Sequence, residues 1–342
     1  MKKTTIEDVA RKAGVSKGTV SAVINNKPTV KSSTREHVLK TIKELNFRPK
    51  GFARVLKGQN VEKSIGLIAR AFDNPFYTSI AIGIKRYANA KGYALFVASS
   101  EGNHANEETI SRLFSNKDVK GAIIAPVLDG TIEIAHLFNL RAINYPFVLL
   151  EEVPGIQTNV VSIDNTNSTY KATKYLIDSG HEKIIHFSGP EYSSHTFERI
   201  NGFRNAFSES NLIFNKELII PAGSHFQDGY KTGKQYFSSI APENRPSAVV
   251  CFNDVIAFGL IAALKELSIQ VPEDISIIGH DDIEFARYWS PPLTTISTPV
   301  DELGRIAADI LIRSIESPHA LPAEKKILQA DLVIRESSKR LK

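Results

Sequence analysis

Several segments of this 342-residue chain carry residue types that catalysis uses. His181 and His186 flank Glu182, but they are five residues apart in a strand-like segment, so they point to opposite faces, whereas a helical zinc motif needs a spacing of four. Segment 229–234 is one residue short of a phosphate-binding loop and lacks the following Ser or Thr. The single cysteine, Cys251, ends an apolar run and is interpreted as inert core. These patterns argue against an enzyme, and they predict neither a cofactor nor a metal site.

Charge is distributed unevenly along the chain. Residues 1–60 hold 14 Lys and Arg but only four Asp and Glu, a net charge of +10, whereas the whole chain carries +5. The remaining 282 residues are therefore net acidic, at −5. A basic head on a mildly acidic body indicates a polyanion-binding module joined to a second function, although a solvated basic surface would give the same count.

The basic segment has the pattern of short helices. Thr5, Ser16 and Ser33 are each placed to cap a helix start, and apolar residues recur behind them at helical spacing. Two helices joined around 14–16 form a helix-turn-helix geometry, whose second helix enters the DNA major groove by its N-terminal residues. The residues expected to read bases are Lys17, Gly18 and Ser21. Those placed to bond phosphates are Thr5, Ser16, Thr19, Asn25 and Thr34.

After residue 60, apolar runs of strand length alternate with helical stretches. The runs are 65–69, 94–98, 122–125, 147–150, 184–187, 218–220, 248–252 and 275–278. This alternation predicts parallel sheets with helices on both faces, and there are too many runs for one sheet. We therefore expect two doubly wound lobes, with a ligand between them at the carboxyl ends of the strands.

A series of distinct short motifs is spread in order along nearly the whole chain. They are 5–10 (Thr-Ile-Glu-Asp-Val-Ala), 13–16 (Ala-Gly-Val-Ser), 19–21 (Thr-Val-Ser), 25–26 (Asn-Asn), 34–35 (Thr-Arg), 47–49 (Phe-Arg-Pro), 53–56 (Ala-Arg-Val-Leu), 65–68, 74–76 (Asn-Pro-Phe), 199–203, 252–254 (Phe-Asn-Asp), 271–274, 279–282 (Gly-His-Asp-Asp) and 292–296. In this series the chain resembles the lactose-repressor (LacI/GalR) family of bacterial transcription regulators.

The resemblance implies a small all-α helix-turn-helix head and an α/β body of two doubly wound parallel-sheet lobes, of the periplasmic-binding-protein type. The expected segments are a head at 1–48, a hinge helix and linker at 49–60, and an effector-binding and dimerisation domain at 61–342. Within that domain, we expect an N-lobe at about 61–161 plus 293–325, and a C-lobe at about 162–292 plus the C-terminal segment.

The family also implies how the hinge and the dimer act on DNA. Leu56 matches the leucine that wedges into the minor groove at the operator centre, and Ala53 matches the position that approaches bases beside it. The alternative for Leu56 is a linker residue that packs on the body. Most members are homodimers that read a pseudo-palindromic duplex with one head per half-site.

Three positions depart from the common family pattern. Ala22 stands where many members have arginine, Gly18 where they have larger polar residues, and Lys50 where asparagine is common. Lys17 and Ser21 must then carry more of the base readout, and Lys17 suits guanine although it lacks the fork of arginine. We therefore expect an operator that differs from the common family half-site.

The resemblance places a small-molecule effector between the lobes. The residues that match family ligand positions, or lie near them, are Phe76, Arg199, Phe226, Asn253 and Asp281. Carboxylate, guanidinium and aromatic groups suit a sugar or another polyol, and a purine would also fit Phe226 and Arg199. The alternatives are a surface ion pair for Arg199, a helix cap for Asp281 and ordinary core for Phe226. Glu152 replaces the basic residue of many relatives, which puts any transferred ligand identity in doubt.

The sequence thus predicts a cytoplasmic transcriptional regulator, most simply a homodimeric repressor. It binds an operator in double-stranded DNA, and a carbohydrate-like effector changes its affinity for that operator. A purine-like corepressor and an activator are alternatives. A remote alternative is a small-molecule capture protein, which would need a signal peptide and has no use for a basic head. No membrane span is expected, because the most apolar stretch, 248–267, is interrupted by Asn253 and Asp254.

Overall fold

The computed structural model describes residues 5–24, 29–45, 63–116, 119–128, 134–191, 193–317, 319 and 321–341. These fall into two units, Met1–Glu62 and Lys63–Lys342, here called the head and the body.

The head is a bundle of three short helices. They are α1 (Ile6–Lys12), α2 (Lys17–Ile24) and α3 (Ser32–Glu44). Thr5 caps α1 in a reciprocal capping box with Asp8, as the sequence predicts. Gly14 turns the chain between α1 and α2 with φ at +63°, a conformation that side-chain-bearing residues rarely adopt. A small core joins the three helices: Val9, Ala10, Ala13, Val20, Val23 and Val38.

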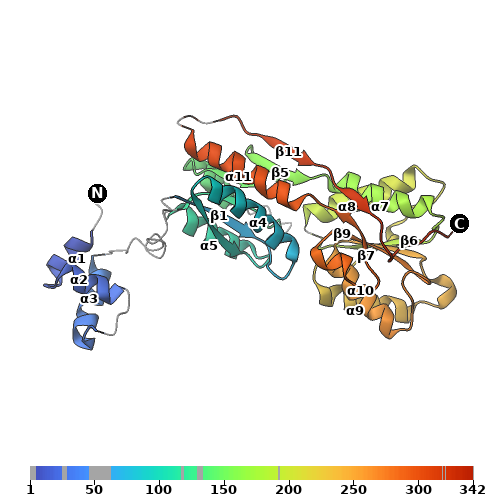
Figure 1. The fold of residues 1–342 in the computed structure, drawn as a ribbon, viewed down its shortest axis with the longest axis horizontal. Coiled ribbons are helices and arrows are strands. Elements are labelled where there is room, and N and C mark those ends of the chain that lie inside the picture. Colours follow the sequence, from blue (N-terminus) through green and yellow to red (C-terminus); the bar gives the residue numbers. More distant parts are fainter. Residues whose placement is uncertain are drawn as a thin grey trace. The chain divides into compact units, whose positions relative to one another are not determined.

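The body contains two lobes, each built around a six-stranded sheet (Figure 1). The first lobe has strand order β11-β5-β4-β3-β1-β2, and all its strands are parallel. Its strands are β1 (Lys63–Ala69), β2 (Tyr93–Ser99), β3 (Val119–Ile124), β4 (Phe147–Leu149), β5 (Asn159–Ile163) and β11 (Lys325–Leu328). Helices α4 (Pro75–Ala90) and α11 (Val300–Glu316) pack together, as do α5 (His104–Ser115) and α6 (Ala135–Ala142).

The second lobe has strand order β12-β10-β9-β8-β6-β7, in which only the edge strand β12 runs antiparallel. Its strands are β6 (Ile184–Ser188), β7 (Ile219–Pro221), β8 (Ala248–Cys251), β9 (Ser276–Asp281), β10 (Thr294–Ser297) and β12 (Asp331–Val333). Its helices pair as α7 (Asn165–Asp178) with α8 (Ser194–Ser208), and α9 (Phe226–Ser239) with α10 (Asp254–Glu266). Single 3-10 turns lie at Lys216–Leu218, Pro242–Asn244 and Glu284–Arg287.

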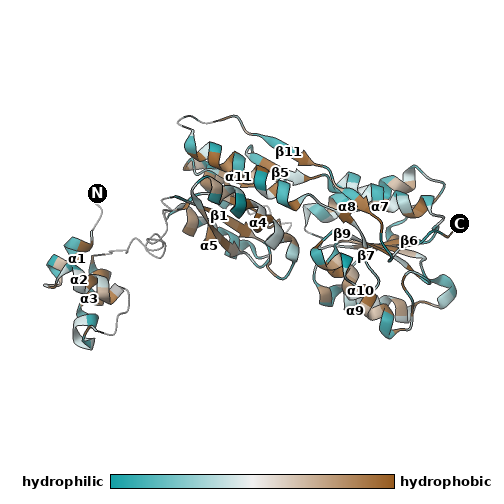
Figure 2. Cartoon of the chain, in the orientation of Figure 1, coloured by the Kyte–Doolittle hydropathy of each residue, from teal (hydrophilic) through white to brown (hydrophobic). Residues whose placement is uncertain are grey.

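Apolar residues concentrate in the strands and on the helix faces that cover them (Figure 2). Strand β1 is buried along all but its first residue, and β8 and β9 are buried throughout. Continuous burial is what parallel strands covered on both faces require. This is why these strands appear in the sequence as uninterrupted apolar runs.

The helix pairs of the second lobe approach closely through glycine. A Cβ at Gly202 of α8 would lie 2.1 Å from the Thr166 carbonyl oxygen of α7. A Cβ at Gly259 of α10 would lie 2.1 Å from the Phe226 carbonyl oxygen of α9. Both distances are far below any real contact, so the backbones of each pair touch directly, with no side chain between them.

The chain crosses between the lobes three times, between β5 and α7, between β10 and α11, and between β11 and β12. The second crossing differs from the expected lobe boundary at residue 293. Strand β10 pairs with β9 in the second lobe, so Thr294–Ser297 belongs there and the chain returns to the first lobe only at α11. The predicted boundary falls too early because β10 is short and rich in threonine. No apolar run marks this strand in the sequence, and its burial comes from the neighbouring strands.

Among the residues that the structure describes, no helix is long and apolar enough to cross a membrane.

Candidate functional site

The start of α2 is the candidate DNA-reading segment of the head. Ser16 caps this helix, because its Oγ accepts a hydrogen bond from the Thr19 backbone N–H at 3.0 Å. The two hydroxyls also bond one another at 2.9 Å. Lys17 and Gly18 are exposed, and Ser21 is half-buried. The segment therefore presents polar groups on a short, capped helix whose opposite side is held in the head core.

Lys17 is not free in the head as it stands. Its Nζ lies 2.6 Å from Glu7 Oε1 of α1, and both side chains are about 60% exposed. This contact lowers the pKa of Glu7, through the hydrogen bond and the positive charge of Lys17. Lys17 must therefore exchange Glu7 for a nucleic-acid partner if it is to read a base, as proposed below.

The other residues predicted to contact DNA have mixed positions. Thr5 is engaged in the cap of α1, with its Oγ1 2.7 Å from Asp8 Oδ2. Thr34 lies half-buried in the first turns of α3. Asn25, Ala53 and Leu56 lie outside the described residues. None of these assignments is tested by the geometry of the head alone, and they stay predictions.

A cavity of about 180 Å³, with both polar and apolar lining, lies between the lobes, at the carboxyl ends of their strands. From the first lobe it is lined by Arg70, Ala71, Asp73, Asn74, Phe76, Tyr77, Glu101, Gly102, Val127 and Leu128. From the second lobe it is lined by Pro190, Ser193, His195, Arg199, Ser224, His225, Phe252, Asn253 and Asp281. Its position agrees with the rule that ligands bind beyond the carboxyl ends of strands in doubly wound sheets.

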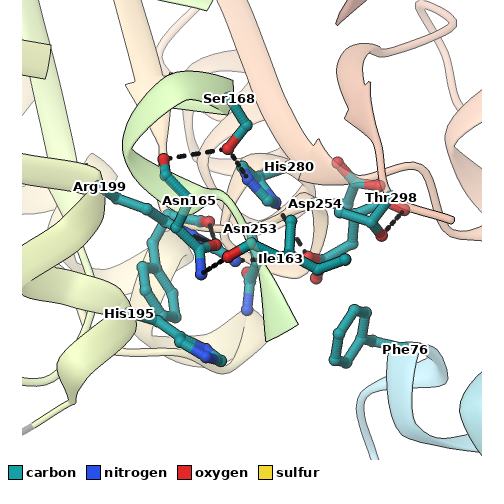
Figure 3. A network of polar contacts seen from close by, with 12 residues as sticks. Phe76, Ile163, Asn165, Ser168, His195, Arg199, Asn253, Asp254, His280 and Thr298 are labelled. Carbon is teal, nitrogen blue, oxygen red and sulfur yellow. Dashed lines mark hydrogen bonds and ion pairs between the residues drawn. The ribbon is translucent and has the colours of Figure 1, made fainter. Parts of the chain in front are cut away.

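Arg199 of α8 is the centre of the polar network in this cavity (Figure 3). Its side chain is buried, and its Nε donates to Asn165 Oδ1 at 3.0 Å. Its Nη1 donates to the Phe252 carbonyl oxygen, and its guanidinium lies over the Phe252 ring at 4.6 Å. These contacts fix the arginine fork, so a ligand meets a rigid donor.

Asp281 ends β9, and its Oδ1 lies 3.7 Å from Arg199 Nη2. It also contacts His280 Nδ1 at 3.1 Å, and His280 Nε2 contacts Ser168 Oγ at 3.0 Å. Burial raises the pKa of Asp281 to about 7, although the charge of Arg199 and a hydrogen bond from Asn74 oppose this rise. Burial also holds the pKa of His280 well below its usual value, so this imidazole is neutral near pH 7.

Asp281 and Asp282 both have positive φ, at +114° and +56°. Non-glycine residues are uncommon in this region, and such strain persists only where the surroundings impose it. Asp282 is held by Arg335 at 2.6 Å, and the Asp281 carbonyl accepts a hydrogen bond from Thr298 Oγ1 at 2.9 Å. The strained turn directs the Asp281 carboxylate toward Arg199.

Of the five predicted effector residues, four line the cavity: Phe76, Arg199, Asn253 and Asp281. Asn253 also caps α10, since its Oδ1 accepts from the Ile256 N–H at 2.8 Å, and its Nδ2 donates to the Ser224 carbonyl. Phe226 is absent from the lining and packs against the core of the second lobe. It begins α9, and its predecessor His225 takes the place at the cavity mouth.

Sequence reasoning missed a second charged group in the cavity wall. Arg70 follows β1 and forms an ion pair with Glu151, which follows β4 and is 3% exposed. Glu151 also accepts a hydrogen bond from Ser194 and lies 3.2 Å from His195 Nε2, both in α8 of the other lobe. The only available signal was their position directly after strands, which singled out Glu151 but not its partner. Among the described residues, no group of three or more His, Cys, Asp or Glu side chains is placed to hold a metal ion.

Comparison with known proteins gives two family models that match the chain. The model of bacterial regulatory proteins of the lacI family matches residues 5–50, and the periplasmic binding protein-like domain matches residues 173–338. The HTH-type transcriptional repressor PurR of Photobacterium profundum is 36% identical over 340 residues, covering 98% of this chain and 99% of that protein. PurR of Vibrio parahaemolyticus serotype O3:K6 is 37% identical with the same coverage.

Solved structures of transcriptional regulators resemble this chain over most or nearly all of its length. A complex of the transcriptional regulator CelR with cellobiose has a TM-score of 0.73 at 26% identity, covering 98% of this chain and all of that one. The lac repressor dimer bound to operator and an anti-inducer has a TM-score of 0.71 at 26% identity, covering 99% and 100%. A LacI family regulator of Enterococcus faecium with bound ribose has a TM-score of 0.70 at 27% identity, covering 82% and 100%.

A helix-turn-helix head joined to a two-lobed body with a polar cleft defines a DNA-binding protein under small-molecule control. The chain belongs to the LacI family of bacterial regulatory proteins. It is a DNA-binding transcriptional repressor with a PurR-like effector domain, and its relatives are not enzymes. The predicted family, fold class and regulatory function are thereby confirmed.

Proposed function

We propose that the chain is a homodimeric repressor that reads a pseudo-palindromic operator and whose affinity for it is set by a small polar molecule bound in the cleft. Homodimers are typical of the family, and the lac repressor structure is a dimer on its operator. In this proposal Lys17, Gly18 and Ser21 read bases, together with Ala53 and Leu56. Thr5, Ser16, Thr19, Asn25 and Thr34 contact phosphates.

The effector site of this proposal is built on the Arg199–Asp281 pair. A rigid guanidinium, a carboxylate and the Phe76 ring can bind a planar or polyhydroxylated molecule that both donates and accepts hydrogen bonds. The cavity, at about 180 Å³, is smaller than the roughly 300–1,000 Å³ of drug-sized sites, which favours a ligand of one or two rings.

A purine base is the effector that we favour. The relatives that share a third of their residues with this chain bear the name PurR, which supports the purine over the carbohydrate expected from the cleft chemistry alone. A sugar is the second candidate, supported by the neighbouring structures with bound ribose and with cellobiose. In either case the effector acts only through unequal affinity for the DNA-competent and DNA-incompetent states.

Operator selection followed by ligand titration tests this function. The full chain is incubated with a random duplex pool at moderate salt, alone and with guanine, hypoxanthine, ribose or cellobiose, and bound DNA is sequenced. We expect a centrally symmetric motif, enriched more strongly with a purine base. If the motif is enriched only when no compound is added, and ribose abolishes the enrichment, the effector is a sugar inducer and not a purine corepressor. No symmetric motif under any condition would contradict the operator and dimer assignments.

Calorimetry measures effector binding independently of DNA binding. Guanine or ribose is titrated into the wild-type chain and into Arg199→Lys, which keeps the charge but loses the fork. We expect binding by the wild type and a loss of at least tenfold in affinity for the variant. Sedimentation at micromolar concentration checks the oligomeric state, and a tetramer would contradict the proposed dimer.

A further inference from the structure

A buried polar chain runs from the outer helices of the first lobe to α8 of the second lobe. Its first part is Glu107 of α5, which is fully buried, and His136 of α6, whose Nε2 lies 2.6 Å from Glu107 Oε1. Neither residue lines the cavity. Burying a carboxylate is costly, and a buried carboxylate is retained only where its hydrogen bonds are satisfied.

The second oxygen of Glu107 reaches the cavity wall. Glu107 Oε2 accepts a hydrogen bond from the Val127 backbone N–H at 2.7 Å. The carbonyl of the same peptide group, that of Pro126, accepts from Arg70 Nε at 2.9 Å and from Arg70 Nη2 at 2.5 Å. A glutamate and an arginine therefore hold the two ends of one peptide unit, and Val127 beside it lines the cavity.

Arg70 continues the chain across the cleft. It is ion-paired with Glu151, and Glu151 contacts Ser194 and His195 at the start of α8. Five successive contacts thus connect His136 in the first lobe to Ser194 in the second. Hydrogen bonds to charged groups are stronger than neutral ones, and in a low dielectric such chains polarise one another.

We propose that Glu107 and His136 are positioning residues of the effector site: by fixing the Pro126–Val127 peptide against Arg70, they hold Glu151 in place for its contacts with α8. This inference rests on the proposed effector function of the cleft. It gives an influence on the contact between the two lobes to a pair of residues that neither line the cavity nor belong to the second lobe.

Hydrogen exchange of the full chain tests the coupling without needing a ligand. Amide exchange is followed in segment 119–128 and in segment 193–199, on opposite lobes. Glu107→Ala removes the buried acceptor of the Val127 backbone N–H, and we expect about tenfold faster exchange in 119–128. We also expect several-fold faster exchange in 193–199. Glu107→Gln, which can still accept from Val127, should exchange within about twofold of the wild type in both segments.

Two further variants keep the test decisive. Glu316→Ala removes a carboxylate of the same lobe that pairs with Lys63 and Tyr93, away from the cavity, and should leave both segments unchanged. Ser194→Ala on the second lobe should accelerate exchange in 119–128, because coupling is reciprocal. It also provides the readout should Glu107→Ala fail to fold.

Two results together would overturn the coupling. In Glu107→Ala, exchange would be faster in 119–128 but unchanged in 193–199. In Ser194→Ala, exchange in 119–128 would be unchanged. Guanine calorimetry gives the functional readout: we expect about tenfold weaker binding for Glu107→Ala and wild-type affinity for Glu107→Gln. If the wild-type chain does not bind guanine, the purine assignment fails, whereas the exchange data still decide this inference.

Discussion

Replacing Asp281 by asparagine is expected to stabilise the protein at neutral pH while impairing its effector site. The carboxylate is 5% exposed, and burial raises its pKa from 3.8 to about 7. A carboxyl group with a raised native pKa binds its proton more tightly folded than unfolded, so its contribution to stability is present at low pH and is lost as pH rises from about 4 to 7. Asparagine resembles the protonated acid, and it tolerates positive φ about as well.

The size of the effect follows from the pKa difference. About three pKa units at 1.36 kcal/mol each amount to about 4 kcal/mol of destabilisation of the wild type above pH 7. Between pH 4 and 7 the gap in unfolding free energy between Asp281→Asn and the wild type should widen by about 1.4 kcal/mol per pH unit. Above pH 7 it should stay constant. Of the neighbouring groups, Arg199 stays charged and His280 stays neutral, whereas burial and the charge of Asp281 both raise the pKa of Asp254, so the titrations of the two carboxyl groups are coupled.

Urea unfolding from pH 4.5 to 8 measures this gap. Trp289 is the single tryptophan, and it stacks on Phe258 in the same lobe as Asp281, so its fluorescence reports on the relevant unit. Glu266→Gln is the control of opposite sign. Glu266 lies in α10 of the same lobe and accepts hydrogen bonds from Lys234 and Tyr230, and these contacts lower its pKa. Its variant should therefore be less stable than the wild type at pH 7, and this difference should shrink on acidification. A gap for Asp281→Asn that does not change with pH, or a wild type more stable than this variant at pH 7.5, would refute the reasoning.

Gly18→Ala is expected to stabilise the head by about 0.5–1 kcal/mol, because a Cβ there meets only Ser16 Oγ at 3.5 Å, and to weaken operator binding by adding bulk to the reading segment; thermal unfolding and fluorescence anisotropy check the two effects. Glu7→Gln removes the ionic partner of Lys17 and should raise operator affinity in the same anisotropy assay, whereas unchanged affinity would show that Lys17 does not contact DNA. Gly259→Ala places a Cβ 2.1 Å from the Phe226 carbonyl and should destabilise the second lobe by about 1–3 kcal/mol; an unshifted urea midpoint of Trp289 fluorescence would show that α9 and α10 can move apart.

The sequence predicted those parts of the fold that depend on local patterns. The capping box at Thr5, the turn at Gly14 and the buried strands β1, β8 and β9 all follow from residues close together in the chain. Strands β5, β10, β11 and β12 were not expected. They are three to five residues long, and β11 is Lys-Lys-Ile-Leu, whose charges suit an exposed sheet edge.

The site was predictable only where one residue carried the signal. Arg199 and Asp281 were singled out individually, and they lie 3.7 Å apart. Arg70 and Glu107 gave no signal, because their shared partner is the backbone of Pro126 and Val127, which no side-chain pattern encodes. Phe226 was misplaced by one position, since helix α9 begins there and turns its ring into the core.

The glycine contacts between paired helices bear on how a signal can travel through the body. Where backbones touch directly, as at Gly202 and Gly259, there is no layer of side chains that can repack to let one helix slide past the other. The second lobe therefore has little room for its paired helices to rearrange, and we expect it to move relative to the first lobe through the three crossing segments. Two of these segments adjoin or contain residues bonded to the site: Asn165, the first residue of α7, accepts from Arg199, and Thr298, between β10 and α11, donates to Asp281. A ligand that binds Arg199 and Asp281 would therefore contact groups bonded directly to the segments that join the two lobes.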